Sequence, residues 1–267
     1  MKINYTELKK YFIKAMISNK CPKVVADDVC DALINASLMG IDSHGINLFE
    51  TYINNIRNKR IKSKNKIKFN KKKTFLLVDG NNNFSHFVAQ RTLEKAYKIA
   101  KKNGICLASV SNVDHYAAAG IHGYNFLEKR KLNNLSIMSF TNADSLATST
   151  YPKKRFFGTN PISYVLRRSQ GKYIYIDMST TQITFNKVKN IRKANSYLSN
   201  NLARDKFGKI TKYPSKVFSL EPIGGYKGFV LGLLVELMTS GITGSNVSNQ
   251  ILPMYGEDQK SFRKISQ

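Results

Sequence analysis

The sequence is short of several residue types, and each shortage narrows the classes of protein that it can encode. It has no tryptophan, three cysteines and four histidines, and its 17 acidic residues face 43 lysines and arginines. Cys21, Cys30 and Cys106 are an odd number without a CxxC pair, which argues against a disulfide framework and against a structural zinc site. This cysteine usage predicts a protein of the reducing cytoplasm.

Long apolar runs are also missing. No uninterrupted apolar stretch approaches the ~20 residues that a membrane-spanning helix requires. The first residues, MKINYTELKKYF, have the pattern of an amphipathic segment and lack the apolar core of a secretory signal. The 267 residues, 42% of them hydrophobic, suffice for one large globular domain or two smaller ones.

The net charge of +26 allows two interpretations. A basic surface attracts phosphate irrespective of base sequence, so one hypothesis is a nucleic-acid binder. However, lysine is spread along the whole chain together with asparagine and isoleucine, which is typical of codon bias, and no known nucleic-acid-binding signature is present. We therefore expect no nucleic-acid partner, and the basic stretch Arg57 to Lys73 is interpreted as a solvated linker.

Hydrophobic periodicity predicts three helices before that linker. The first has Thr6 as its N-cap, the second begins at Pro22 and ends at Gly40, and the third runs from about Ile46 to Arg57. After the linker the pattern alternates between strands and helices. The predicted strands are 75–79, 105–110, 135–140 and 172–178, with another resuming at 162, and the predicted helices are 87–102, 117–129 and 227–239.

This order predicts an α/β fold: a small helical domain (residues 1–72) followed by a mixed α/β domain (residues 73–267). The glycine signature GxGxxG does not follow any of the predicted strands. A Rossmann dinucleotide site is therefore not supported.

The stretch DSHGINLF places His44 between Ser43 and Gly45 in a predicted loop between helices. Histidine exchanges a proton near neutral pH, and the neighbouring hydroxyl could fix its tautomer. The alternative is a surface or capping histidine, because Asp42 and Ser43 are ordinary N-cap residues.

A second histidine, His115, follows a predicted strand directly and precedes three alanines at a helix start. The small residues would let a ligand approach the backbone closely, and the free N–H groups of a helix start suit a phosphate. The alternative is a tightly packed helix with His122 at the surface.

Three further motifs carry polar residues at turns or strand ends: the turn Gly158-Thr159-Asn160-Pro161, the strand ending in Asp177-Met178-Ser179, and the turn Gly224-Gly225 before a helix that has Lys227 in its first turn. Hydroxyls and a carboxylate at a strand end are typical of ribose or phosphate contacts. A lysine in a first helical turn is unfavourable toward the helix dipole, which favours an anionic partner there.

Together and in this order, the motifs resemble the malate/L-lactate dehydrogenase type 2 family of NAD(P)-dependent oxidoreductases, from the first helix to about Tyr255. The SHGIN spelling looks most like the branch of 2,3-diketo-L-gulonate reductases; the family also includes ureidoglycolate and sulfolactate dehydrogenases and Δ1-piperideine-2-carboxylate reductase. The resemblance implies a non-Rossmann, mixed-sheet domain that binds NAD or NADP beside the helical domain, and a homodimer.

By the same resemblance, His44 donates a proton to the substrate oxygen, Ser43 orients it, and His115 lines the same cleft as a second candidate acid/base. The implied reaction is hydride transfer between nicotinamide and a 2-oxo or 2-hydroxy acid. The implied cofactor contacts are Thr159, Tyr173, Ile174, Tyr175, Ile176, Asp177, Met178, Ser179, Tyr226 and Lys227.

Three departures from the family pattern motivate an alternative. The family has an arginine at the position of Leu48, suited to gripping a substrate carboxylate, and a glycine pair at the position of Tyr151-Pro152. Family chains also continue where this one ends in the polar tail GEDQKSFRKISQ, which predicts C-terminal truncation. The alternative hypothesis is a truncated, decaying member that retains the fold with little or no catalysis.

Overall fold

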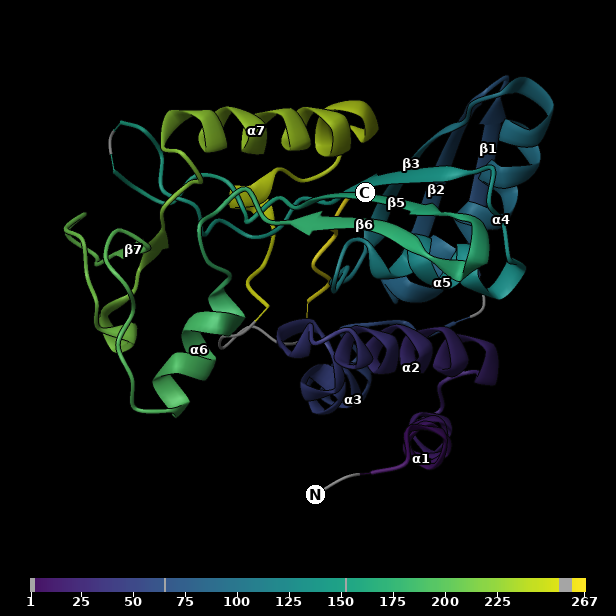
Figure 1. Cartoon of the computed structure of the whole chain (residues 1–267), viewed down its shortest axis with the longest axis horizontal. Helices are drawn as coiled ribbons and strands as arrows, with labels where there is room; N and C mark the ends of the chain where they lie inside the picture. The colour runs from purple at the N-terminus through teal and green to yellow at the C-terminus, as the bar shows by residue number, and fades with distance from the viewer. Residues whose placement is uncertain (1–2, 65, 152, 255–260) are drawn as a thin grey trace.

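The computed structural model describes residues 3–64, 66–151, 153–254 and 261–267. The helices and main strands, in chain order, are α1 (Tyr5–Ser18), α2 (Lys23–Leu38), α3 (Phe49–Arg57), β1 (Lys68–Lys72), β2 (Phe75–Asn83), α4 (Ser85–Asn103), β3 (Leu107–Val113), α5 (Ile121–Arg130), β4 (Ser136–Phe140), β5 (Ile162–Arg167), β6 (Tyr173–Met178), α6 (Phe185–Lys193), β7 (Ala203–Arg204), β8 (Ser219–Leu220) and α7 (Tyr226–Glu236). Figure 1 shows α1 to α3 on one side of the strands and α7 on the other.

The helical N-terminal region that the periodicity predicts is present. Asn4, and not Thr6, caps α1: its side-chain oxygen accepts the backbone N–H groups of Thr6 (2.9 Å) and Glu7 (3.3 Å). Pro22 precedes α2, where its missing N–H costs no helical hydrogen bond. Between α2 and α3 the chain makes two short 3-10 turns, at Asp42–His44 and Ile46–Leu48, and these carry the histidine loop.

The first sheet has the order β1-β2-β3 and is mixed, because β1 pairs with β2 antiparallel and β2 with β3 parallel. The strands β4, β5 and β6 form a second, antiparallel sheet. The α/β class with a mixed sheet is therefore confirmed. Strand β1 lies within the basic stretch that was interpreted as a solvated linker, so that interpretation is wrong for its second half.

The first half of the basic stretch is not fully solvated either. Arg60 is 1% exposed and donates to the carbonyl groups of Pro253 (2.6 Å) and Met254 (3.3 Å), and Ile61 is buried in the main hydrophobic cluster. A charged residue in a lysine-rich run can thus be a core residue, because backbone carbonyls accept hydrogen bonds from both terminal nitrogens of its guanidinium.

The described part of the C-terminal tail, residues 261–267, connects the two sheets. Gln267 and Val110 exchange both backbone hydrogen bonds at 2.9 Å, and Asn142, after β4, donates to the carbonyl of Ser266. Ile265 is 1% exposed and packs in the main cluster. Arg263, Ile265 and Ser266 of this tail are buried; residues 256–260 of the tail lie outside the described residues.

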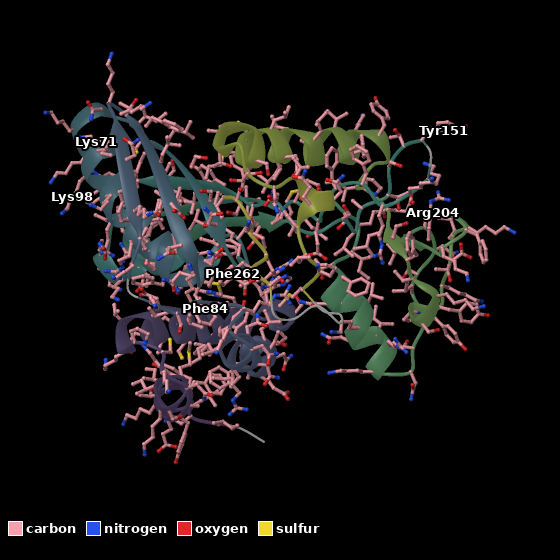
Figure 2. All side chains as sticks on the ribbon, turned by 180° about the vertical axis from the view of Figure 1, so that it is seen from behind. Lys71, Phe84, Lys98, Tyr151, Arg204 and Phe262 are labelled. Carbon is pink, nitrogen blue, oxygen red and sulfur yellow. The ribbon has the colours of Figure 1, made fainter. Side chains whose placement is uncertain are left out.

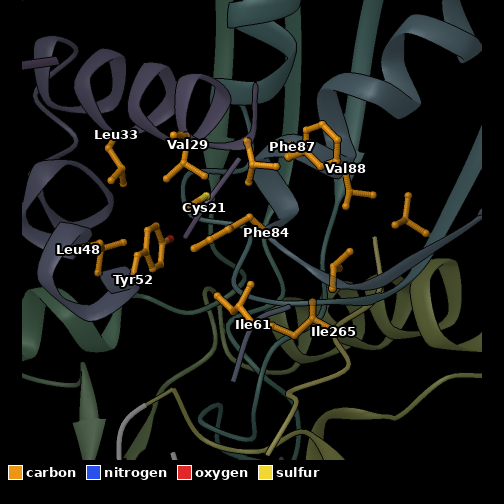
Figure 3. Packing of buried hydrophobic residues seen from close by; sticks show 14 of the residues in the cluster. Cys21, Val29, Leu33, Leu48, Tyr52, Ile61, Phe84, Phe87, Val88 and Ile265 are labelled. Atoms are coloured by element: carbon orange, nitrogen blue, oxygen red, sulfur yellow. The ribbon is translucent and has the colours of Figure 1, made fainter. Parts of the chain in front are cut away.

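The main hydrophobic cluster draws on both predicted domains. It includes Val29 and Leu33 of α2, Tyr52 of α3, Phe87 of α4 and Val110 of β3, and Figure 3 shows several of these side chains packed together. The core is therefore shared across residue 72, and the domain boundary there stays a prediction. In the part of the chain that the structure describes, no helix is long and apolar enough to cross a membrane.

Candidate active site

His44 lies at the end of the first 3-10 turn, where the chain reverses between α2 and α3. The Ser43 hydroxyl is 2.9 Å from His44 Nδ1. The backbone carbonyl of Ser43 accepts a hydrogen bond from Asn186 of α6 at 2.9 Å, so the loop is held from both sides. These contacts fix the ring and direct its second nitrogen away from the loop.

His115 follows β3 and faces His44. The two ring centroids are 5.7 Å apart and the planes are inclined by 22°. The Tyr52 hydroxyl, from α3, lies 2.9 Å from His115 Nδ1. Each histidine therefore has its Nδ1 held by a hydroxyl, and neither Nε2 has a hydrogen-bond partner among the described residues.

Both histidines line a cavity of about 450 Å³. Its wall comes from parts of the chain that are distant in sequence: the two histidine loops, the segment after β4, the start of α6, the segment 248–254 and Arg263. The charged residues that line it are Asp144, Arg155 and Arg263. The volume is of the size that holds a small organic ligand.

Burial makes both histidines poor proton acceptors in the free protein. Burial lowers the pKa of His44 to about 4. The pKa of His115 lies well below its usual value, chiefly through burial and then through the neighbouring His44 and Arg263. Both rings are therefore neutral at pH 7.

Leu48 does not face this cavity. It is 3% exposed and packs in the main cluster, where Figure 3 shows it beside Tyr52. The expectation that this position presents its side chain to the substrate is wrong for this chain, because the second 3-10 turn directs it into the core. Cationic groups reach the cavity from Arg155 and Arg263 instead.

Of the predicted cofactor residues, Thr159 lines the cavity. Its carbonyl accepts the backbone N–H (2.9 Å) and the hydroxyl (3.1 Å) of Thr180, and the Thr180 carbonyl accepts the N–H of Ile223 (3.0 Å). The structure thus joins the Thr159 turn, the end of β6 and the turn before α7 into one unit. Tyr226 and Lys227 are exposed at the start of α7.

The residues of β6 divide between two faces. Ile174, Ile176 and Met178 are exposed at 40%, 48% and 41%, whereas Tyr173, Tyr175 and Asp177 face α5. Tyr173 donates to Glu128 of α5, and Ser179 donates to the carbonyl of Thr181. None of these seven residues lines the cavity, so their assignment to the cofactor stays a prediction.

The alanines after His115 serve packing. Ala118 contacts α2, and Ala119 contacts α4 through Ala89. The N–H of Gly120, before α5, donates to the carboxylate of Asp177 at 2.8 Å, so this helix start already has an anionic group from its own chain. The alternative that placed His122 at the surface is wrong, since His122 is 0% exposed.

The turn Gly158-Thr159-Asn160-Pro161 has a second, structural role. Asn160 is fully buried and donates to the Glu236 carboxylate at 2.8 Å. That carboxylate also accepts the hydroxyl (2.6 Å) and backbone N–H (2.8 Å) of Ser248, which lines the cavity. A buried carboxylate satisfied by neutral donors therefore ties the turn to the cavity wall. No group of three or more metal-binding side chains is found within the described ranges.

Sequence reasoning missed Asp144, Arg155, Asn186 and Arg263. The three charged residues lie in irregular segments with no periodicity or motif, and Arg263 belongs to the polar tail that was interpreted only as a sign of truncation. Asn186 lies in α6, a helix that the sequence pattern did not predict. The spacing of residues along the chain gave no signal for any of them.

Comparisons with known proteins place this site in a family. The chain is 28% identical over 262 residues to a malate dehydrogenase of Pyrococcus abyssi, covering 94% of this chain and 71% of that protein. It is 24% identical over 275 residues to a 2,3-diketo-L-gulonate reductase of Shigella boydii, covering 97% and 79%. The solved structure of a sulfolactate dehydrogenase from Methanocaldococcus jannaschii superposes with a TM-score of 0.87 at 25% identity, covering all of this chain and 76% of the other. These coverages leave the predicted truncation a prediction.

The family model described as malate/L-lactate dehydrogenase matches residues 3–267, beyond the limit near Tyr255 that the motifs indicated. The chain belongs to this family of dehydrogenases.

Proposed function

We propose that the chain is an NAD(P)-dependent oxidoreductase that interconverts a 2-oxo acid and the corresponding 2-hydroxy acid. The observation that carries this proposal is the pair His44 and His115. Two neighbouring imidazoles line one cavity, each held at Nδ1 by a hydroxyl at 2.9 Å, with both Nε2 atoms left for a ligand. That geometry suits proton exchange with one small oxygen-bearing substrate.

The nicotinamide cofactor supplies or accepts the hydride at the substrate carbon. The chain's own residues handle the proton that accompanies it. In the reducing direction a protonated His44 donates from Nε2 to the carbonyl oxygen as negative charge develops there, and in the oxidising direction the neutral ring takes the hydroxyl proton. Because the buried ring is neutral in the free protein, reduction requires a proton taken up when the anionic substrate binds and raises the pKa of the histidine.

We place the nicotinamide dinucleotide along the unit that joins Thr159, Thr180 at the end of β6 and the turn before α7. Gly225 has a φ of +65°, no side chain caps α7, and a Cβ atom at Gly225 would have no atom within 4 Å. An uncapped helix start beside open space is suited to a pyrophosphate, with Lys227 and Tyr226 next to it. The proposal covers NAD and NADP alike.

We further propose a homodimer in the cytoplasm. The support for the dimer is α7, which is apolar on all sides but leaves Val230, Leu233, Leu234 and Leu237 between 39% and 56% exposed. A helix that is apolar all round is normally covered, and Figure 1 shows α7 on the outside of the chain. The support for the compartment is that all three cysteines are free.

The decisive experiment combines binding and turnover. NADH or NADPH should raise the stability of the full chain by ~2.7 kcal/mol at a hundredfold excess over the dissociation constant. Loss of reduced-nicotinamide absorbance with a panel of 2-oxo acids should then identify the substrate. A melting temperature unmoved by millimolar amounts of both cofactors, together with no turnover, would refute the proposal.

The alternative of a decayed member loses one of its arguments. It rested in part on Leu48 as the lost carboxylate anchor, but that position lies in the core and two arginines line the cavity. The histidine geometry also remains intact.

A further inference from the structure

The cavity holds more positive charge than its own residues neutralise. Arg155 and Arg263 line it together with one carboxylate, that of Asp144, while the two histidines are uncharged at neutral pH. No other charged side chain lines the cavity among the described residues. Two guanidinium groups against one carboxylate leave a net positive charge in a partly enclosed space, where a charge attracts more strongly than in water.

Arg263 has a donor without an acceptor. Its Nη2 donates to Asp144 and its Nε to the carbonyl of Leu252 at 2.9 Å. Its Nη1 is buried and has no hydrogen-bond partner among the described residues, and the residue as a whole is 2% exposed. A buried donor left unsatisfied costs about 1–3 kcal/mol, and an arriving acceptor removes that cost.

Arg263 lines the same cavity as the two histidines. Its charge also contributes to the low pKa of His115, after burial and His44. A small ligand in this cavity therefore has the guanidinium and both imidazoles on its walls. Asp144 and Leu252 fix the guanidinium in one orientation, so the donor is already in place before a ligand binds.

Arg155 lines the same cavity from another segment. Its Nε donates to the carbonyl of Phe218, and its guanidinium stacks over the Phe218 ring at 4.1 Å. Burial lowers the pKa of Arg155, and the charge of Asp144 opposes that effect. Asp144 thus pairs directly with Arg263, whereas Arg155 is held by Phe218.

We propose that Arg263 and Arg155 form the carboxylate-binding part of the cavity, with Arg263 Nη1 as the principal donor to the substrate carboxylate and Asp144 as the group that positions the Arg263 guanidinium. This inference rests on the proposed function. It assigns the anchoring role to residues distant in sequence from Leu48, and it makes the substrates small anionic 2-oxo acids rather than neutral carbonyl compounds.

The test is a calorimetric titration of the full chain, saturated with reduced cofactor, with oxamate, an analogue of a 2-oxo acid that cannot be reduced. Arg263→Met should weaken oxamate binding about 10- to 100-fold, because a hydrogen bond to a charged group is lost. Arg155→Met should weaken it by less. The matched control is Arg204→Met: Arg204 pairs with Glu221 in the β7 part of the chain, outside the cavity (Figure 2), and its loss should leave oxamate binding unchanged.

The variant Asp144→Asn distinguishes two roles of the Asp144–Arg263 pair: part of a site that binds an anion, or an ion pair that only stabilises the cavity wall. The asparagine can still accept the Arg263 N–H but carries no negative charge, so oxamate should bind several-fold more tightly. A structural pair predicts the opposite, since its loss would loosen the cavity wall. Weaker binding in Asp144→Asn, unchanged binding in Arg263→Met, or no binding of millimolar oxamate by the wild type would each overturn the inference.

The same measurements distinguish a failure of this inference from a failure of the proposed function. Wild-type binding of oxamate that responds to Arg263→Met, without turnover of any 2-oxo acid, would support the anion site and refute the activity. Turnover of 2-oxo acids with KM unchanged in Arg263→Met would refute the anion site alone.

Discussion

The four histidines of the chain form two pairs that differ in surroundings, although all four are buried enough to lower their pKa. His44 and His115 line the cavity, and a hydroxyl holds each ring. His86 and His122 are fully buried, with ring centroids 5.3 Å apart. Within the part of the chain that the structure describes, both nitrogens of His86 and the Nδ1 of His122 have no hydrogen-bond partner.

This difference shows that a lowered pKa does not identify a functional histidine. Burial produces the same direction of shift in both pairs, and only the cavity pair combines it with a hydroxyl at each Nδ1 and access for a ligand. Tyr52 lies between the pairs: its ring centroid is 5.2 Å from His86 and 6.3 Å from His115, and its hydroxyl contacts only the latter of the two.

The largest expected effect is on turnover. His44→Ala should lower kcat about 10²- to 10⁴-fold and leave cofactor affinity nearly unchanged, because its proton transfer matters chiefly in the transition state. Steady-state kinetics and cofactor titration measure the two quantities. His122→Gln, from the interior pair, is the matched control and should retain turnover within a few-fold.

His115→Ala decides which histidine is the principal acid/base. A larger loss of kcat than in His44→Ala would assign the proton transfer to His115. Normal turnover in both variants would contradict the assignment of the cavity pair altogether.

The next effect tests whether the Leu48 side chain lies in the hydrophobic core or faces the cavity. Leu48→Arg should destabilise the chain by about 3–5 kcal/mol, because it places an unpaired charge in the main cluster. Urea unfolding would measure the loss, with Leu48→Met, a volume-conserving change, expected below about 1.5 kcal/mol. If Leu48→Arg instead folded normally and improved the use of carboxylate substrates, the position would face the cavity after all.

Much of the fold was predictable because the deciding signals are local. Capping residues, glycine stops and hydrophobic periodicity located α2, α4 and β6 within a few residues of their bounds. The sequence failed where a distant part of the chain decides the structure. Strand β1 reads as a charged linker and is a strand only because β2 provides its hydrogen-bond partners. Arg60 is a core residue only because two carbonyls from residues 253 and 254 reach it.

The same distinction applies to the site. Ser43, His44 and His115 have recognisable neighbours in sequence, so motifs locate them. Asp144, Arg155 and Arg263 acquire their role from meeting in space, and nothing in their immediate sequence marks them. The error at Leu48 has a similar origin, because the family pattern predicts which residue stands at a position but not the direction of its side chain once the arginine is replaced.

A smaller effect concerns the free energy of unfolding, which His122 of the interior pair makes dependent on pH. Burial lowers the pKa of His122 to about 4, against which the hydrogen bond to the Tyr116 carbonyl acts weakly. Between about pH 4 and 6.5 the unfolded chain binds this proton and the folded chain does not, so stability falls as pH falls through that window. His122→Gln keeps a side-chain donor and cannot titrate. It should reduce the slope of unfolding free energy against pH by up to about 1.4 kcal/mol per pH unit, measured by urea unfolding at several pH values. An unchanged slope would show that His122 is protonated in the folded state.

The smallest effect concerns Tyr52, which connects the two pairs. Tyr52→Phe removes the hydroxyl that lies 2.9 Å from His115 Nδ1 and keeps the ring that packs against His86. When this hydroxyl donates, Nδ1 is the acceptor and the His115 Nε2–H points to the ligand; without it both tautomers are populated. A hydrogen bond of this kind contributes about 0.5–1.5 kcal/mol, so kcat should fall about 3- to 10-fold. The pH profile of kcat should shift as well, since the proton affinity of His115 changes. A role in packing alone predicts instead a lower melting temperature with kcat and its pH profile unchanged, and that result would remove Tyr52 from the group of residues that position the cavity histidines.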